Sequence, residues 1–308
     1  MPSSNKPIIR LITFKQTKTS PYALGVLDHS LEKIIPLDTL KIQCNDMQTL
    51  IQMWNPALKD KLEQAILNTQ GTLHLDTIIK AAPIPHPFAE IICLGINYLD
   101  HAKESAKFKK EAFDGTRQEA VYFGKRVSEA LPDGGTIPAH AHLTQKLDYE
   151  VELGVIIGKD ARNVARKDAF EYVFGYTIIN DISARDIQLK HKQWYFGKSL
   201  EGSAPMGPWI VTKDAFAFPP KLEITSRVNG QLRQKSSTDL MIFDIAYVIE
   251  ELSAGMLLKA GSIISMGTPS GVGMGFEPPK FLKKGDTIVC NIEGIGTLRN
   301  TIGDSMDS

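Results

Sequence analysis

The stretch DYEVELGVII, from Asp148 to Ile157, first alternates between polar and apolar residues and then becomes wholly apolar. This pattern predicts a β-strand whose two faces are both covered. Because side chains two residues apart share a face of a strand, Glu150 and Glu152 are expected to project together, roughly 6.6 Å apart. Two ionised carboxylates at a partly buried site are costly unless a positive charge, such as a divalent cation, neutralises them. For an isolated Glu-x-Glu, a half-exposed strand with polar side chains toward water is the simpler interpretation.

Further apolar runs of strand length flank this stretch, and few helical patterns interrupt them beyond residue 88. The predicted strands are 91–95, 149–157, 176–180, 209–211, 222–228, 262–266 and 287–292. Helices are predicted at 169–174 and 242–256, each with a glycine near its end. Strands do not alternate regularly with helices, so the sequence predicts a β-rich α+β fold and not a doubly wound sheet.

The N-terminal part of the chain has a different texture. Short strands are expected at 8–14 and 23–27, and apolar residues recur at helical spacing over 47–67, where Pro56 can open a second helix. Three prolines at 81–87 favour an extended connector. We therefore expect a small accessory domain over residues 1–80 and a main domain over residues 88–308.

Composition and charge exclude several classes of protein. Lys and Arg together number 35, as do Asp and Glu, so the formal net charge is zero. No long-range field would hold a polyanion, and neither a nucleic acid nor a membrane is expected as a partner. The three cysteines are widely spaced, and the sequence contains neither an apolar leader nor a stretch long enough to span a membrane. A reducing cytoplasm is the expected location.

A third acidic residue, Asp181, follows the predicted strand 176–180. If a helix begins there, Arg185 and Gln188 share a face with Asp181 and could point into a site. Asp181 could instead cap that helix and pair with Arg185. Three carboxylates without an imidazole would select a hard ion, Mg²⁺ or Mn²⁺, and not zinc.

Histidines occur in two patterns of interest. His101 and Glu104 form a His-x-x-Glu pattern after a predicted strand, and on a helix they lie one turn apart on the same side. A carboxylate bonded to one imidazole nitrogen makes the other a better base, although a solvated pair on an exposed helix is an alternative. His140 and His142 have no further ligand nearby and are interpreted as loop residues.

Two glycine-containing segments could bind an anion. Gly-Lys-Ser at 197–199 is not a phosphate-binding P-loop, because Lys192 stands where that motif requires glycine. Lys198 remains a candidate cation. The glycine-rich segment 267–273 follows a predicted strand and could offer backbone N–H groups to an anion, or could be a plain turn.

Five motifs, taken in order, resemble the fumarylacetoacetate hydrolase family over residues 90 to 303. They are Gly-x-Asn-Tyr-x-x-His-x-x-Glu from residue 95, Asp-Tyr-Glu-Val-Glu-Leu-Gly-Val-Ile-Ile-Gly from residue 148, Asn-Asp-Ile-Ser-Ala-Arg-Asp-Ile-Gln from residue 180, Gly-Lys-Ser from residue 197, and Gly-Thr-Pro-Ser-Gly-Val-Gly from residue 267. The resemblance implies the family's β-roll main domain, the small N-terminal α/β accessory domain of bacterial-type members, and a homodimer.

The resemblance also implies roles for individual residues. Three acids would hold the metal, namely Glu150, Glu152 and Asp181. His101 with Glu104 would form the base dyad on a mobile lid, together with Lys198 as a catalytic cation. Contacts with the substrate are implied for Arg185, Gln188, Thr268 and Lys125, although Phe-Gly-Lys-Arg around Lys125 departs from the commoner family pattern. The lid stretch 103–120 is longer than in minimal members and is expected to select the substrate.

These residue types and the resemblance predict a metal-dependent hydrolase that cleaves a carbon–carbon bond in a small 2-oxo acid or acylpyruvate. His101 would activate water, while the metal and Lys198 would stabilise the oxyanion and the departing enolate. Decarboxylation of oxaloacetate and keto–enol tautomerisation use the same enolate, so these activities remain open alternatives. A non-catalytic binding module is disfavoured, because the dyad and all three acids are present.

Overall fold

The fold is built around one long mixed β-sheet. The computed structural model describes residues 6–109, 112, 115 and 119–304. Within them the sheet has eleven strands in the order β4-β3-β2-β1-β13-β11-β10-β16-β6-β7, with β5 beside β1. These strands are β1 (Arg10–Lys15), β2 (Ala23–Leu27), β3 (Lys33–Pro36), β4 (Leu73–His74), β5 (Ile79–Lys80), β6 (Ile91–Gly95), β7 (Val121–Lys125), β10 (Val151–Ile157), β11 (Val173–Asn180), β13 (Met206–Thr212) and β16 (Ile263–Ser265).

A second sheet packs against the first and closes the main core. Its order is β15-β14-β17-β18-β8, and β9 and β12 form a separate pair. The strands are β8 (Thr136–Pro138), β9 (Leu147–Asp148), β12 (Ser183–Ala184), β14 (Glu223–Val228), β15 (Gln231–Ser237), β17 (Thr287–Ile292) and β18 (Gly296–Gly303). Val151, Leu153 and Val155 of β10 share a core cluster with Ile288 and Cys290 of β17. The alternate residues of β10 therefore bury one face of the central strand between the two sheets.

Helices are short and lie around the sheets. They are α1 (Met47–Gln52), α2 (Pro56–Asn68), α3 (Leu99–Lys109), α4 (Ala169–Tyr172), α5 (Arg185–Lys190), α6 (Tyr195–Lys198) and α7 (Ile245–Gly255), with 3₁₀ turns η1 (Arg166–Asp168), η2 (Lys213–Ala215), η3 (Thr238–Leu240) and η4 (Gly273–Gly275). Pro56 opens α2 as expected, after Asn55 caps the helix by accepting a hydrogen bond from the Leu58 N–H. The described part of the chain contains no helix with the length and apolar character of a membrane span.

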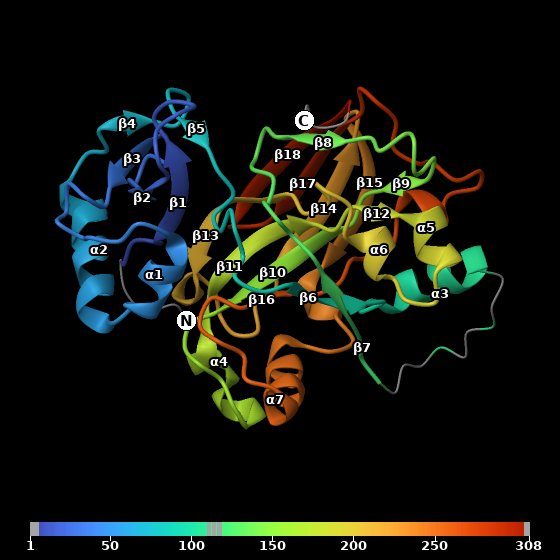
Figure 1. Ribbon diagram of the computed structural model, residues 1–308. Coiled ribbons are helices and arrows are strands. Elements are labelled where there is room, and N and C mark those ends of the chain that lie inside the picture. The colour runs from blue at the N-terminus through green and yellow to red at the C-terminus, as the bar shows by residue number, and fades with distance from the viewer. Residues whose placement is uncertain (1–5, 110–111, 113–114, 116–118, 305–308) are drawn as a thin grey trace.

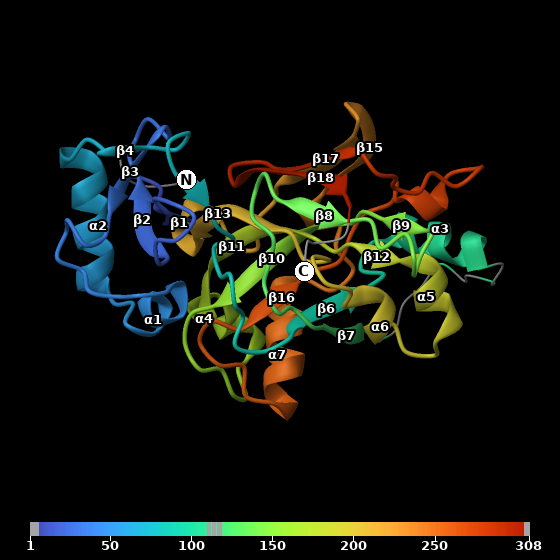
Figure 2. The same cartoon turned by 45° about the horizontal axis from the view of Figure 1, so that its top comes forward.

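The predicted β-rich α+β class is confirmed, and every predicted strand is present with small shifts of its ends. The described part of the accessory unit, residues 6–80, lies at one end of the molecule, while α3, α5 and α6 lie at the other (Figures 1 and 2). Strand β10 is bonded to β11 and β16 on its two sides, and all seven of its residues are buried. The N-terminal end of β10 points away from the accessory unit, and polar residues lie at that end of the strand.

The accessory unit shares both a sheet and a core with the main domain. Strand β1 pairs with β13, with Leu11 opposite Ile210. Leu11, Met206 and Ile210 also belong to one buried apolar cluster. The prolines at 81–87 mark a connector in the chain, but the hydrogen bonding and packing continue across the two parts.

We expect the whole chain to unfold in one calorimetric transition, because the shared sheet and core couple its two parts. Leu11→Ala should lower the midpoint of that transition, since removing a fully buried leucine side chain costs about 2 to 5 kcal/mol. Leu67→Ala, in the same unit but at a side chain that is 57% exposed, should change it little. Two transitions, with only one displaced by Leu11→Ala, would contradict this coupling.

Candidate active site

The three predicted metal-binding acids meet where β10 and β11 lie side by side. Glu150 directly precedes β10, Glu152 is its second residue, and Asp181 directly follows β11. The antiparallel register places Val151 opposite Asn180, and the Asp181 N–H donates to the Glu150 carbonyl at 2.8 Å. One oxygen of each carboxylate lies within 4.8 Å of the others. Strand register alone thus assembles three buried acids from two segments.

Buried cations compensate two of these acids. The Lys198 Nζ lies 2.6 Å from Glu150 Oε2 and 2.7 Å from Asp181 Oδ2, and Arg185 Nη2 lies 2.6 Å from Glu150 Oε1. Burial opposes ionisation of Glu150, but Arg185 and Lys198 outweigh it and hold its pKa below the ordinary value. Burial likewise opposes the charge on Lys198, yet Asp181 and Glu150 raise the pKa of that ammonium. The two groups are therefore a charged pair.

Glu152 has a different environment. Its Oε2 accepts hydrogen bonds from Ser265 Oγ at 2.6 Å and from the Gly267 N–H at 2.9 Å. Within the described ranges, no basic side chain forms an ion pair with it. Burial, followed by the neighbouring Asp181 and Glu150, raises its pKa well above the ordinary value. The cluster thus has too little positive charge, and its oxygen donors fit a hard divalent cation.

Lys125 bonds to Asp181 but does not line the pocket. Its side chain is 0% exposed, and its Nζ donates to Asp181 Oδ1 at 2.7 Å, to the Ile182 carbonyl at 3.0 Å and to the Lys198 carbonyl. All three ammonium protons are thus engaged. The predicted contact between Lys125 and substrate does not fit this position, because this lysine is fully buried, does not line the pocket and is bonded to Asp181.

Arg185 also has partners other than those predicted. Strand β12 intervenes after Asp181, so α5 begins only at Arg185 and the expected pairing of these two residues does not form. The Arg185 Nε donates instead to Asp148 Oδ2 at 2.9 Å, and its Nη1 donates to Gln188 Oε1 at 3.1 Å. Asp148 further accepts from the N–H groups of Gly273 and Met274 at 2.6 and 3.0 Å. A role for Asp148 was not predicted from the sequence, although this residue is the first of the stretch DYEVELGVII.

The glycine-rich segment 267–273 serves the protein's own carboxylates. The Gly271 N–H donates to Glu104 Oε1 at 2.9 Å, and Gly273 is already bonded to Asp148. Gly271 has φ +99°, and a Cβ there would lie 2.0 Å from the Arg233 carbonyl oxygen, so only glycine fits. These N–H groups are not free to bind a substrate anion. The segment instead positions acids on either side of the pocket.

Thr268 lies at the pocket and is held by a residue that sequence reasoning missed. Its hydroxyl donates to the Val151 carbonyl at 3.0 Å and accepts from Gln234 Nε2 at 2.7 Å. Gln234 Oε1 in turn accepts from the Val151 N–H at 3.2 Å and from Ser226 Oγ at 2.8 Å. Gln234 is fully buried on β15, where no local pattern distinguishes it from a solvent-facing polar residue.

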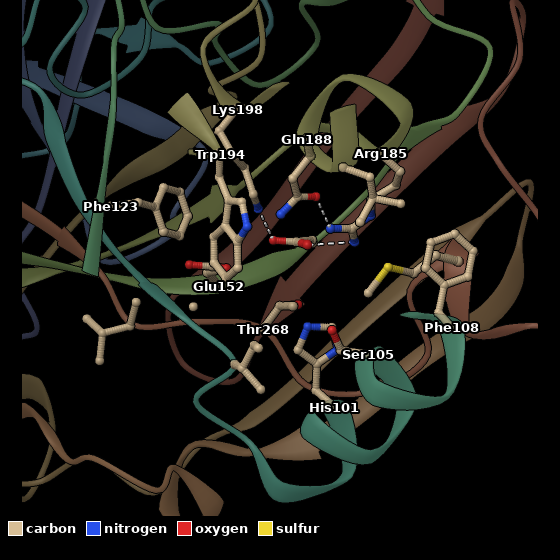
Figure 3. Close-up of a pocket in the computed structure, with 16 residues that line it drawn as sticks. His101, Ser105, Phe108, Phe123, Glu152, Arg185, Gln188, Trp194, Lys198 and Thr268 are labelled. Atoms are coloured by element: carbon tan, nitrogen blue, oxygen red, sulfur yellow. Dashed lines mark hydrogen bonds and ion pairs between the residues drawn. The ribbon is translucent and has the colours of Figure 1, made fainter. Parts of the chain in front are cut away.

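The His101–Glu104 dyad is present on α3. His101 Nδ1 lies 3.0 Å from Glu104 Oε2, and His101 is only 4% exposed, which excludes the solvated surface pair. Because Glu104 occupies Nδ1, the other ring nitrogen is available to the pocket. Figure 3 shows His101 extending from α3 toward Lys198, Gln188 and Arg185 on the opposite side. Residues 110–111, 113–114 and 116–118 of the expected lid lie outside the described residues.

The pocket between α3, β10, α5 and α6 is small and polar at its inner end. Its cavity volume is about 30 Å³. Seven of the predicted site residues line it, namely His101, Glu150, Glu152, Arg185, Gln188, Lys198 and Thr268. His140 and His142 do not contribute, and His140 Nε2 bonds to the Glu201 carbonyl at 2.8 Å. The pocket thus combines a base, two cations and an acidic ion site.

The chain's similarity to known proteins agrees with this geometry. The domain described as fumarylacetoacetate (FAA) hydrolase C-terminal matches residues 90–303. The chain belongs to the fumarylacetoacetate hydrolase family. It is 50% identical to oxaloacetate tautomerase YisK of Bacillus subtilis over 222 residues, which is 72% of each chain.

Solved structures of family members match almost the whole chain, including the accessory unit. A fumarylacetoacetate hydrolase from Exiguobacterium antarcticum is 36% identical, with a TM-score of 0.79 over 96% of this chain and 100% of its own. A maleylpyruvate hydrolase from Sphingobium sp. SYK-6 is 29% identical, with a TM-score of 0.75 over the same shares. Membership of this family of tautomerases, isomerases and hydrolases supports an enzymatic role.

Two matched substitutions test the assignment of the ion site. Glu152→Gln should leave the metal-free protein at least as stable as wild type, because the folded state disfavours a charge at Glu152. It should also abolish the rise in melting temperature on adding Mn²⁺ or Mg²⁺. Glu150→Gln should destabilise even the metal-free protein, by about 3 to 5 kcal/mol, since Arg185 and Lys198 lose a buried partner.

Thermal unfolding at pH 7, with and without added ion, distinguishes these outcomes. Equal metal-free destabilisation in both variants would contradict the charge balance described here. Unchanged ion-dependent stabilisation in Glu152→Gln would remove that residue from the ion site.

Proposed function

We propose that this enzyme catalyses the metal-dependent keto–enol tautomerisation of a small 2-oxo acid, with oxaloacetate as the best candidate. A buried His–Glu dyad lies across a narrow pocket from three acids and Lys198. This arrangement is the main support for the proposal. Tautomerisation requires a proton to move between a carbon and an oxygen and needs no second reactant. The 50% identity to an oxaloacetate tautomerase supports the same reaction.

The dyad supplies the base. Glu104 is fixed by the Gly271 N–H and holds His101 Nδ1, so the proton-free Nε2 can take a proton from the carbon beside the oxo group. Negative charge then develops at the oxo oxygen. Return of the proton to that oxygen gives the enol, and the reverse sequence restores the keto acid, so no atoms are gained or lost.

The opposite side of the pocket supplies positive charge. Lys198 carries a stabilised ammonium and Arg185 a guanidinium, and both line the pocket. They can bind the substrate carboxylate and the charged oxo oxygen, while Gln188 and Thr268 offer neutral polar groups. A divalent ion held by Glu150, Glu152 and Asp181, which we propose to be Mg²⁺ or Mn²⁺, would add positive charge that favours ionisation of the 2-oxo acid.

Carbon–carbon hydrolysis of an acylpyruvate is the second candidate. The same dyad could activate water, and two hydrolases share the fold. The predicted order of preference is reversed here because the chain is 50% identical to an oxaloacetate tautomerase. Decarboxylation of oxaloacetate requires the same positive charge and no activated water.

The dyad can be tested separately from ion binding. His101→Ala should lower kcat for oxaloacetate tautomerisation by about 10²- to 10⁴-fold, while leaving Mn²⁺ affinity and inhibition by oxalate nearly unchanged. Glu104→Gln should act in the same direction but less strongly, because the imidazole remains. Ultraviolet absorbance of the enol follows turnover, and calorimetry measures the affinities.

The matched control is His142→Ala, at an exposed histidine outside the pocket, and it should behave as wild type. Full tautomerase activity in His101→Ala would contradict the mechanism. Efficient cleavage of acetylpyruvate, together with negligible tautomerisation, would favour the hydrolase instead.

A further inference from the structure

A second cavity lies directly beside the active-site pocket. It has a volume of about 170 Å³ and lies between α3 and the η4 segment. Two side chains, Phe108 and Met274, line both this cavity and the active-site pocket. We call these two side chains, which lie where the two spaces adjoin, the partition.

The partition is apolar, whereas the inner end of the active-site pocket is charged. Figure 3 shows Phe108 beyond His101 and Ser105, on the side away from Lys198 and Trp194. Met274 is 7% exposed and follows Gly273, whose N–H is bonded to Asp148. Beyond the partition the second cavity is lined by Phe276, over whose ring lie the cations of Arg233 and Lys280 at 5.0 and 4.6 Å from the centroid.

Two contacts join α3 to residues between 271 and 277, one at Gly271 and one an exposed ion pair at Glu277. Glu104 accepts from the Gly271 N–H at 2.9 Å, and the Lys107 Nζ lies 3.0 Å from Glu277 Oε2. Glu104 and Lys107 flank Phe108 on one face of the helix. The position of Phe108 is thus coupled to the same carboxylate that orients His101.

We propose that Phe108 and Met274 set the maximum length of the substrate, and that the cavity behind them would accept a hydrocarbon tail if the partition were removed. This inference rests on the proposed function, in which the 2-oxo acid group binds at the charged inner end. The far end of the substrate then points toward the apolar partition. A short 2-oxo acid fits in front of it, whereas a longer unbranched chain meets the Phe108 ring.

The test uses binding of oxamate, which mimics a 2-oxo acid, and its N-butyl and N-hexyl derivatives to Mn²⁺-loaded protein. By calorimetry, wild type should lose at least about tenfold in affinity between oxamate and N-hexyloxamate. Phe108→Ala should bind oxamate within about twofold of wild type. It should bind N-hexyloxamate at least about tenfold more tightly, since each buried methylene contributes about fourfold.

Phe276→Ala is the matched control, because Phe276 lines only the second cavity. Alone it should change neither affinity, and combined with Phe108→Ala it should reduce the gain for N-hexyloxamate. Equal binding of all three ligands by wild type, or no gain in Phe108→Ala, would overturn the partition. Failure of wild type to bind oxamate at all would overturn the proposed function as well, whereas absent tautomerase activity with the expected binding series would overturn only the reaction.

Discussion

Four carboxylates and three cations are buried together at the ends of β10 and β11, and the architecture of the site follows from the need to balance them. The acids are Asp148, Glu150, Glu152 and Asp181, and the cations are Lys125, Arg185 and Lys198, all at most 4% exposed. An unpaired buried charge costs several kcal/mol, and among the described residues ion pairs engage every one of these groups except Glu152. If all four acids were ionised, one negative charge would be in excess of the three positive charges, and a bound divalent ion would more than neutralise it. Burial, together with the neighbouring Asp181 and Glu150, disfavours that excess charge and raises the pKa of Glu152.

This requirement also explains why distant segments converge on the site. Asp148 accepts hydrogen bonds from Arg185 of α5 and from the N–H groups of η4. Lys125, at the end of β7, donates both to Asp181 and to the carbonyl at the end of α6. Glu104 bonds α3 to the glycine-rich segment, and this contact keeps the base on the side of the pocket opposite the acids. In this family different reactions share one fold. Under the proposed function, the charged end of the pocket would bind the 2-oxo acid group, and Phe108 and Met274 would limit the length of the substrate.

Local sequence patterns predicted much of the fold and most of the residues around the pocket. Period-two alternation around Glu150 and Glu152 identified a strand and a shared face. The spacing of His101 and Glu104 placed them on one side of a helix, and the resemblance to the family supplied their role as a dyad. Interactions that depend on long-range register could not be predicted in this way. A helix beginning at Asp181 would have placed Arg185 on the same face, either toward a site or paired with Asp181, but β12 pairs with β9 before α5 begins at Arg185. Likewise the prolines at 81–87 mark a connector, whereas the pairing of β1 with β13 involves residues about 200 positions apart and leaves no local signal.

The proposed mechanism requires that the three buried acids hold a divalent ion on the side of the pocket opposite the dyad. The most direct measurement is an anomalous difference map from crystals of the protein grown with Mn²⁺ and oxalate. The account predicts one strong peak bonded to carboxylate oxygens of Glu150, Glu152 and Asp181, with oxalate between that ion and His101. A peak bonded elsewhere, or a pocket in which Lys198 keeps both of its carboxylate contacts and no ion binds, would contradict the account.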